Sequence, residues 1–250
     1  MNQSFNFARF GRLLRKHTAE HIKSYALGAG VLLGGMLAVM GFLAYVGGGL
    51  SHDQQEILFA LFLLAAGTFF ATTVLAEFGA GSRAALALML PASQFEKYLV
   101  AWVFSLPFFL LLFVVDFYLV DWLVISLSSA PDTVASVFTA EILSSLAGIF
   151  LVVHGVALLG SISFRRQQFI KTSFLLFAVV VGLVVVNYQV LSAMVGPELR
   201  MSLPFTSVNL NNSPSVSLPE AQSRQLLLPL LALVPLLWAA AYARLTEKQL

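Results

Sequence analysis

Few residues in this sequence are placed where they could perform chemistry. His154 lies about midway along one long apolar stretch, and Asp116 and Asp121 lie toward the end of another. Ionisable residues inside apolar segments are functional candidates, because burying a charge is costly. For His154 the sequence favours a neutral imidazole bonded to a neighbouring helix over a direct transport role. For the two aspartates it favours carboxylates that face water at a helix end over a proton or ion site.

Motifs of common enzyme classes are missing. The chain has no cysteine, which excludes disulfides, thiolate metal sites and cysteine nucleophiles. It has no Gly-Lys dipeptide for a nucleotide-binding P-loop, no H-E-x-x-H and no G-x-S-x-G. The four histidines do not cluster at metal-ligand spacing, and no nucleic-acid-binding module is present. We expect no catalytic, cofactor-binding or metal-binding residues and no nucleic-acid partner, and an intramembrane enzyme is the least favoured class.

The composition is that of an integral membrane protein. Charged residues make up 10% of the chain and apolar residues 59%, whereas a soluble domain has about 25% charged residues. Six apolar runs approach the roughly 20 residues that a membrane-spanning helix needs. They cover residues 25–46, 56–76, 98–118, 142–162, 169–188 and 226–242. The sequence therefore predicts an all-α, six-span transmembrane domain over residues 25–250, with Pro107 bending the third span.

Residues 1–24 read as a basic amphipathic segment before the first span. Its apolar residues recur at helical spacing, while its cations fall between them. Such a helix lies among lipid headgroups, where its cations meet anionic lipid. The interface residues expected from this pattern are Phe7, Phe10, Arg12, Leu14 and Arg15.

The distribution of lysine and arginine predicts the orientation. With the N-terminus in the cytoplasm, twelve of the fourteen Lys and Arg residues lie in cytoplasmic segments. Only Arg200 and Arg224 lie outside. Positive charge is concentrated on the cytoplasmic side of membrane proteins. The bias requires an even number of spans with both termini in the cytoplasm.

The segment between the second and third spans has the strongest local signals. Pro91 ends the preceding helix, because the residue before a proline is pushed out of the α region. Ser93 and Glu96 form a capping-box pattern, which predicts a new helix from Gln94. Residues 81–97 are thus expected to form a short cytoplasmic helix, a break and a capped helix start. The residues that these signals single out are Arg83, Leu90, Pro91, Ser93, Glu96 and Lys97.

Two further features leave alternatives open. Residues 192–225 form a long outer loop rich in Ser, Asn and Pro, which is re-entrant, ordered or disordered. In the first span, Gly30-x-x-x-Gly34 allows close helix packing, for which contact within the chain is favoured over a dimer face.

Two local segments resemble a known family. Residues 88–93 (LMLPAS) and 95–99 (FEKYL) resemble a motif of small bacterial permease-like proteins. Residues 164–166 (FRR) and 169–172 (FIKT) resemble a second segment of the same group. Together with the basic helix and six spans, they make the chain similar to the permease subunit of ABC transporters of the ABC-2 exporter type.

The resemblance implies an ATP-driven exporter of the bacterial inner membrane. In such permeases the amphipathic helix and the short helix after the second span touch a separate cytosolic ATPase, which hydrolyses the ATP. These would be residues 5–23 and 81–90 here, and two permease chains would form a dimer. The resemblance implies that the residues coupling to the ATPase are Arg83, Leu90, Pro91, Ser93, Glu96 and Lys97. The scarcity of polar groups within the apolar runs is compatible with a hydrophobic or amphipathic substrate. The alternative is a non-transporting membrane scaffold, assembly factor or sensor subunit.

Overall fold

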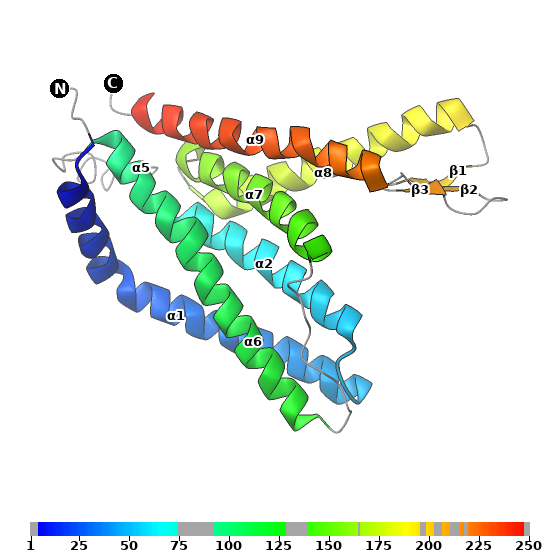
Figure 1. Ribbon diagram of the computed structural model, residues 1–250, viewed down its shortest axis with the longest axis horizontal. Coiled ribbons are helices and arrows are strands. Elements are labelled where there is room, and N and C mark those ends of the chain that lie inside the picture. Colours follow the sequence, from blue (N-terminus) through cyan, green and yellow to red (C-terminus); the bar gives the residue numbers. More distant parts are fainter. Residues whose placement is uncertain are drawn as a thin grey trace.

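The computed structural model of the 250-residue chain is a bundle of long helices with a small sheet at one edge (Figure 1). The described residues are 5–74, 93–128, 140–164, 166–195, 199–202, 207–210, 216–217 and 220–247. The helices are α1 (Phe7–Gly47), α2 (His52–Val74), α5 (Gln94–Val103), the π-helical turn η1 (Phe104–Phe108), α6 (Phe109–Leu127), α7 (Ala140–Ser163), α8 (Gln168–Val195) and α9 (Glu220–Glu247). Each predicted apolar run has its described residues in one of these helices or, for the third run, in the continuous helix from α5 to α6.

Helix α1 joins the predicted amphipathic segment and the first span into one helix of 41 residues. Asn6 begins it by accepting hydrogen bonds from the amides of Ala8 and Arg9. Gly48, at φ +75°, ends it in the left-handed conformation that glycine adopts without strain. The helix changes direction after its first turns, drawn in dark blue (Figure 1). An amphipathic segment thus meets the first span at an angle without leaving the helix.

The third apolar run is a continuous helix from α5 to α6. The expected disturbance at Pro107 takes the form of the π-helical turn η1. Proline has no amide hydrogen and therefore cannot supply the usual helical hydrogen bond. A π-helical turn accommodates this within a helix, and such turns often occur at functional positions.

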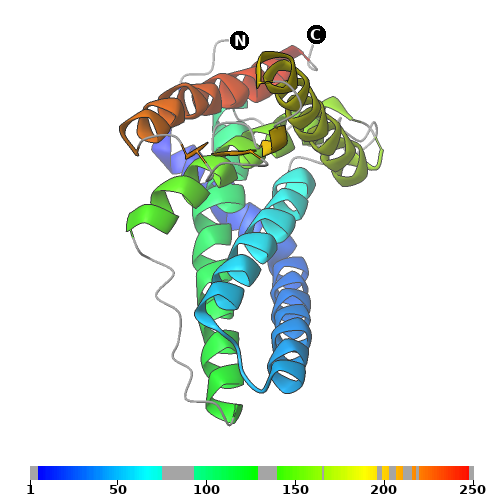
Figure 2. The same cartoon turned by 90° about the vertical axis from the view of Figure 1, so that its right-hand side faces the viewer.

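The helices alternate in direction, so that the start of α1, the start of α5 and the end of α9 share one end of the bundle (Figure 1). Figure 2 shows α1, α2 and α6 running together, with α8 and α9 across one end of them. One apolar cluster joins α1, α2, α6 and α7 around Phe113 and Phe117. A second joins α5, α7 and α9 around Leu158 and Leu245.

Close contacts between helices depend on three glycines. A Cβ atom at Gly67 of α2 would meet the ring of Phe150 on α7. A Cβ at Gly155 of α7 would lie 2.9 Å from Cβ of Leu237 on α9, and one at Gly160 would collide with Thr172 on α8. Small residues allow membrane helices to approach closely, since their backbones can then touch.

The glycine pair of the first span is not used in this way. A Cβ at either Gly30 or Gly34 would have no neighbouring atom within 4 Å among the described residues. The prediction that this pair packs within the chain is therefore wrong. The glycines that allow close helix contact lie instead on α2 and α7, where they meet side chains of neighbouring helices.

Five helices in the described part of the chain are long and apolar enough to cross a membrane. They are Phe7–Gly47, His52–Val74, Gln94–Leu127, Leu146–Ser163 and Gln168–Met194. Helix α9 is not one of them, and it holds Pro229 and Pro235 within its length. The chain is therefore a multi-pass membrane protein by the length and composition of its helices.

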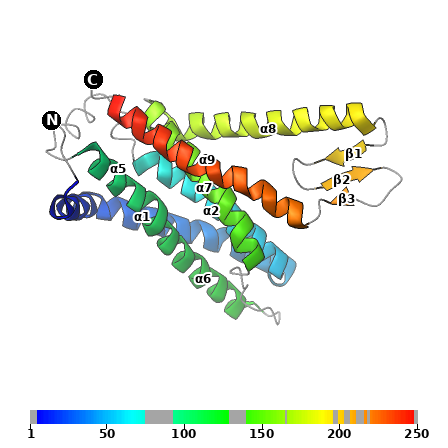
Figure 3. The ribbon, with the colours of Figure 1, turned by 45° about the horizontal axis from the view of Figure 1, so that its top comes forward.

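The predicted outer loop contains a small three-stranded antiparallel sheet, an exception within the otherwise helical fold of the described residues. Its strands are β1 (Leu199–Ser202), β2 (Ser207–Leu210) and β3 (Val216–Ser217), in that order. Leu199 pairs with Leu210 and Val208 with Val216. Figure 3 shows the sheet beside the last turns of α8, between that helix and the start of α9. Part of this loop is thus ordered as strands, which are held by antiparallel pairing with their neighbours.

Candidate functional site

The start of α5 has the cap that the sequence predicts. Helix α5 begins at Gln94, and Ser93 Oγ accepts a hydrogen bond from the Glu96 amide at 3.1 Å. In return, Glu96 Oε2 accepts one from the Ser93 amide at 3.0 Å. This reciprocal arrangement satisfies two amides that the helix itself cannot pair. It fixes the direction in which the third span leaves the preceding segment.

The same glutamate also holds the start of α1. Its other oxygen, Oε1, accepts hydrogen bonds from Arg9 Nε at 3.1 Å, Arg9 Nη2 at 2.9 Å and the Asn6 amide at 2.8 Å. The Glu96 side chain is fully buried, and that of Arg9 is 29% exposed. Charge-assisted hydrogen bonds of this kind are among the stronger ones in proteins. The capping carboxylate therefore ties two helices together that are 87 residues apart in sequence.

Aromatic rings extend this contact to α9. The ring of Phe5 lies 5.9 Å from that of Phe95, and Phe95 lies 6.1 Å from Tyr242 of α9. Tyr98 packs on Tyr242 and donates a hydrogen bond to the carbonyl of Trp238 at 3.0 Å. We call this arrangement the α1–α5–α9 junction. Its members are Phe5, Asn6, Arg9, Ser93, Phe95, Glu96, Tyr98, Trp238 and Tyr242.

The other predicted coupling residues are not part of this junction. Lys97 is buried behind the junction, with a side chain 5% exposed. Arg83, Leu90 and Pro91 lie outside the described residues, as does the predicted short helix. The junction therefore includes Ser93 and Glu96 from the predicted set. It adds Arg9, whose role the sequence pattern did not indicate because the pairing is not local.

The predicted interface helix turns much of its apolar face toward the protein. Phe10 and Leu14 are half-buried against the second apolar cluster, whereas Phe7 is 81% exposed. Arg12 and Arg15 are exposed. The expected segregation of charge is present, but part of the apolar stripe packs on α5 and η1 where lipid was expected. His17, for example, lies 4.6 Å from the ring of Phe104.

His154 connects three helices through a series of hydrogen bonds, which we call the His154 chain. Trp238 Nε1 of α9 donates to His154 Nδ1 at 3.3 Å. His154 Nε2 lies 3.0 Å from Ser105 Oγ in η1, and that hydroxyl donates to the Trp102 carbonyl at 3.3 Å. An indole nitrogen can only donate, so Nδ1 must accept and Nε2 must carry the proton. The fully buried imidazole is thus neutral and bonded to neighbouring helices, as the sequence favoured.

The two aspartates do not face water, so the favoured interpretation of them is wrong. Asp121 is fully buried, and the Asp116 side chain is 9% exposed. They occupy the face of α6 that carries Phe113, Phe117 and Val120, all of them in the first apolar cluster. Asp116 Oδ2 has no hydrogen-bond partner among the described residues. Helical spacing, which placed both residues near the outer end of the span, did not reveal that this face is covered.

No group of three potential metal-binding side chains occurs within the described ranges. The arrangement is suited to transmitting movement between helices, since the junction and the His154 chain both join α9 to the third span.

Comparison of the chain with protein-family models, with curated proteins and with solved structures returned no match.

Proposed function

We propose that this chain is the permease subunit of an ABC-2 type exporter of the bacterial inner membrane. It moves a hydrophobic or amphipathic substrate, and a separate cytosolic ABC ATPase supplies the energy. The observation that carries the proposal is the buried Glu96, which bonds Arg9 of α1 and caps α5 at once. The start of α1 belongs to one of the segments that would touch the ATPase, residues 5–23, and α5 follows the other, residues 81–90, along the chain.

The proposed topology has six spans with both termini in the cytoplasm. It is supported by five span-capable helices, by the alternating direction of all the long helices, and by the concentration of Lys and Arg at one side. In this topology α9 is the sixth span, and the α1–α5–α9 junction lies at the cytoplasmic end. Two permease chains complete the pathway.

The junction gives the coupling a physical route. A push on residues 81–97 would reach α5 through its capped first turn, and the Glu96–Arg9 pair would carry it to the amphipathic part of α1. Rigid helices that shift relative to each other are a common means of transmitting such movement. The π-helical turn η1, held by Ser105 and His154, is the point at which the third span can change its packing.

Isolation of the tagged chain in mild detergent, followed by an ATP-hydrolysis assay, tests the proposal. An ABC ATPase should be retained and active. Deletion of residues 81–90 should release it, and Glu96→Gln should lower ATP hydrolysis by the complex. Glu56→Gln is the matched control, because Glu56 pairs with His52 at the opposite end of the bundle. Isolation without an ATPase, or equal retention by the deletion variant, would contradict the proposal.

One observation favours the alternative of a non-transporting scaffold, assembly or sensor subunit. His154 and Ser105 are fully buried and bonded within the protein, so these polar groups serve helix packing and are not exposed to a polar solute. A scaffold would show stable protein partners and no nucleotide-dependent activity in the same isolation.

A further inference from the structure

An apolar slot opens between α1, α2 and the start of α6. Its volume is about 430 Å³, within the range of small-ligand sites. Of the 13 residues that line it, only Ser24 and Tyr25 carry a polar side chain. Phe70, Phe109 and Leu112 contribute apolar walls from the other two helices. Water is poorly accommodated in such a space, since it needs two to four polar partners.

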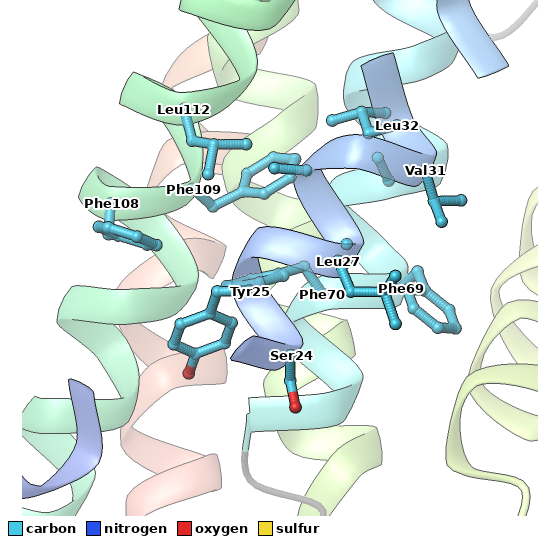
Figure 4. Close-up of a pocket in the computed structure, with 13 residues that line it drawn as sticks. Ser24, Tyr25, Leu27, Val31, Leu32, Phe69, Phe70, Phe108, Phe109 and Leu112 are labelled. Atoms are coloured by element: carbon cyan, nitrogen blue, oxygen red, sulfur yellow. The ribbon is translucent and has the colours of Figure 1, made fainter. Parts of the chain in front are cut away.

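The slot is polar at one end only. Figure 4 shows the hydroxyl groups of Ser24 and Tyr25 at one end, while Leu32 and Leu112 lie at the other. The eight helical steps from Ser24 to Leu32 correspond to about 12 Å along α1. The Tyr25 hydroxyl is also hydrogen-bonded to His17 Nε2 at 2.6 Å. A ligand that fits this arrangement is amphipathic, with a long apolar tail and a head that accepts hydrogen bonds.

A positive charge lies next to the polar end in sequence, and more precede it on the same helix. Lys23 directly precedes Ser24 and is exposed, as are Arg12 and Arg15, which lie two to three turns earlier in α1. None of these three forms an ion pair with another described residue, whereas Lys16 is paired with Glu20 at 3.7 Å. Each lysine or arginine near a membrane surface contributes about 1 kcal/mol to the binding of anionic lipid. The charge therefore complements an anionic headgroup.

The helices that form the slot are among those able to cross a membrane, so phospholipid is the ligand that surrounds them. Lipid tails are as apolar as the slot itself, which means that burial of the tail alone provides little driving force. Selectivity must come from the polar end. We propose that the slot binds one acyl chain of an anionic phospholipid, whose phosphate lies at Ser24, Tyr25 and Lys23.

This inference goes beyond the proposed transport function and does not require an ATPase. A bound lipid in this position would lie between the start of the first span, α2 and α6, directly after the amphipathic part of α1.

Photo-crosslinking in reconstituted vesicles tests the proposal without any partner protein. The full chain is placed in phosphatidylcholine vesicles that contain a minor share of phosphatidylglycerol bearing a diazirine on its acyl chain. Peptide mass spectrometry should then find the label on residues that line the slot. The same experiment with diazirine-labelled phosphatidylcholine should give weaker labelling. Lys23→Gln should reduce labelling by phosphatidylglycerol about fivefold, the effect of one cation near the surface.

Two substitutions fill the slot from different helices, Gly28→Phe from α1 and Leu112→Trp from α6. Both should abolish labelling of the slot. Gly30→Phe is the matched control, because a side chain at either Gly28 or Gly30 meets open space, yet only Gly28 lines the slot. Unchanged labelling in both filled variants would overturn the proposal. Equal labelling by the two lipids would also overturn it, since the anionic head would then play no part.

Discussion

Glu96 shows how one side chain can serve two structural purposes. Each of its oxygens has a separate task, because Oε2 closes the cap of α5 while Oε1 receives Arg9 and Asn6. A buried carboxylate requires such compensation, since an unpaired buried charge is strongly destabilising. Loss of either partner therefore affects both helices.

A double-mutant cycle measures this coupling. Glu96→Ala and Arg9→Ala, made singly and together, should be non-additive by about 1–3 kcal/mol in the free energy of unfolding in detergent. The control cycle uses Lys16→Ala and Glu20→Ala, whose side chains are 44% and 55% exposed. That exposed pair should couple by no more than about 0.5 kcal/mol. Equal coupling energies in the two cycles would show that the buried Glu96–Arg9 pair stabilises the fold no more than an exposed pair does.

The His154 chain makes a prediction about proton position. Nitrogen-15 NMR of His154 should show a protonated Nε2 and an unprotonated Nδ1, because Trp238 can only donate. Detection of the other tautomer would contradict the assigned hydrogen bonds.

Substitution of Trp238, the donor to His154, provides a second test of these hydrogen bonds. Trp238→Phe leaves Nδ1 without a donor and should lower the free energy of unfolding by about 1–3 kcal/mol. Trp122→Phe is the control, since Trp122 is 63% exposed, and it should change stability by less than about 0.5 kcal/mol. Similar losses in both variants would count against the hydrogen bond.

For individual side chains, the sequence predicts contacts between residues close in the chain but not contacts between distant residues. The capping box follows from residues three positions apart, and it is confirmed at the atomic level. The partner of Glu96 could not be predicted, because nothing in the pattern links it to Arg9. The same limit explains the error at Asp116 and Asp121, whose burial depends on which neighbouring helices cover their face.

Among the helices, glycine position decides which pairs can approach closely. The first span has the recognisable Gly30-x-x-x-Gly34 pattern, yet a Cβ at either glycine would meet no atom within 4 Å in the described part of the chain. Gly160 and Gly155, which lack that spacing, lie against α8 and α9. A glycine pattern therefore predicts packing poorly unless the partner surface is known.

Two matched substitutions test this distinction. Gly160→Ala introduces a methyl group that collides with Thr172, so it should cost about 1–3 kcal/mol of unfolding free energy. Gly30→Ala meets no neighbour and should be neutral or stabilise the helix by up to about 1 kcal/mol. Thermal unfolding in detergent distinguishes them. A Gly160→Ala chain as stable as Gly30→Ala would refute the close contact of α7 with α8.

Element type was more predictable than element extent. The described residues of the six apolar runs are all helical, because hydrophobic length constrains a membrane chain strongly. The fusion of the amphipathic segment with the first span was not predicted, although no proline or helix-ending signal separates them. The small sheet was missed because its strands have two to four residues, too few for a periodic pattern.

For the molecule as a whole, the sequence and the structure contribute different parts of the account. Charge distribution predicts which end is cytoplasmic, a property that helix geometry alone does not contain. The structure adds that the starts of α1 and α5 and the end of α9 meet at one end. The lipid slot adjoins the same amphipathic part of α1. The proposed motor would therefore bind at the end of the molecule that also carries the proposed lipid site.

The most direct test of the central claim is the side of the membrane on which the junction lies. The absence of native cysteine allows single-cysteine reporters at Ala19, exposed on the amphipathic part of α1, and at Ser51, exposed between α1 and α2. In intact cells, a membrane-impermeant maleimide should modify Ser51→Cys and leave Ala19→Cys unmodified. Inside-out vesicles should show the reverse. Modification of Ala19→Cys from outside the cell would contradict a cytosolic junction and, with it, coupling to an ATPase.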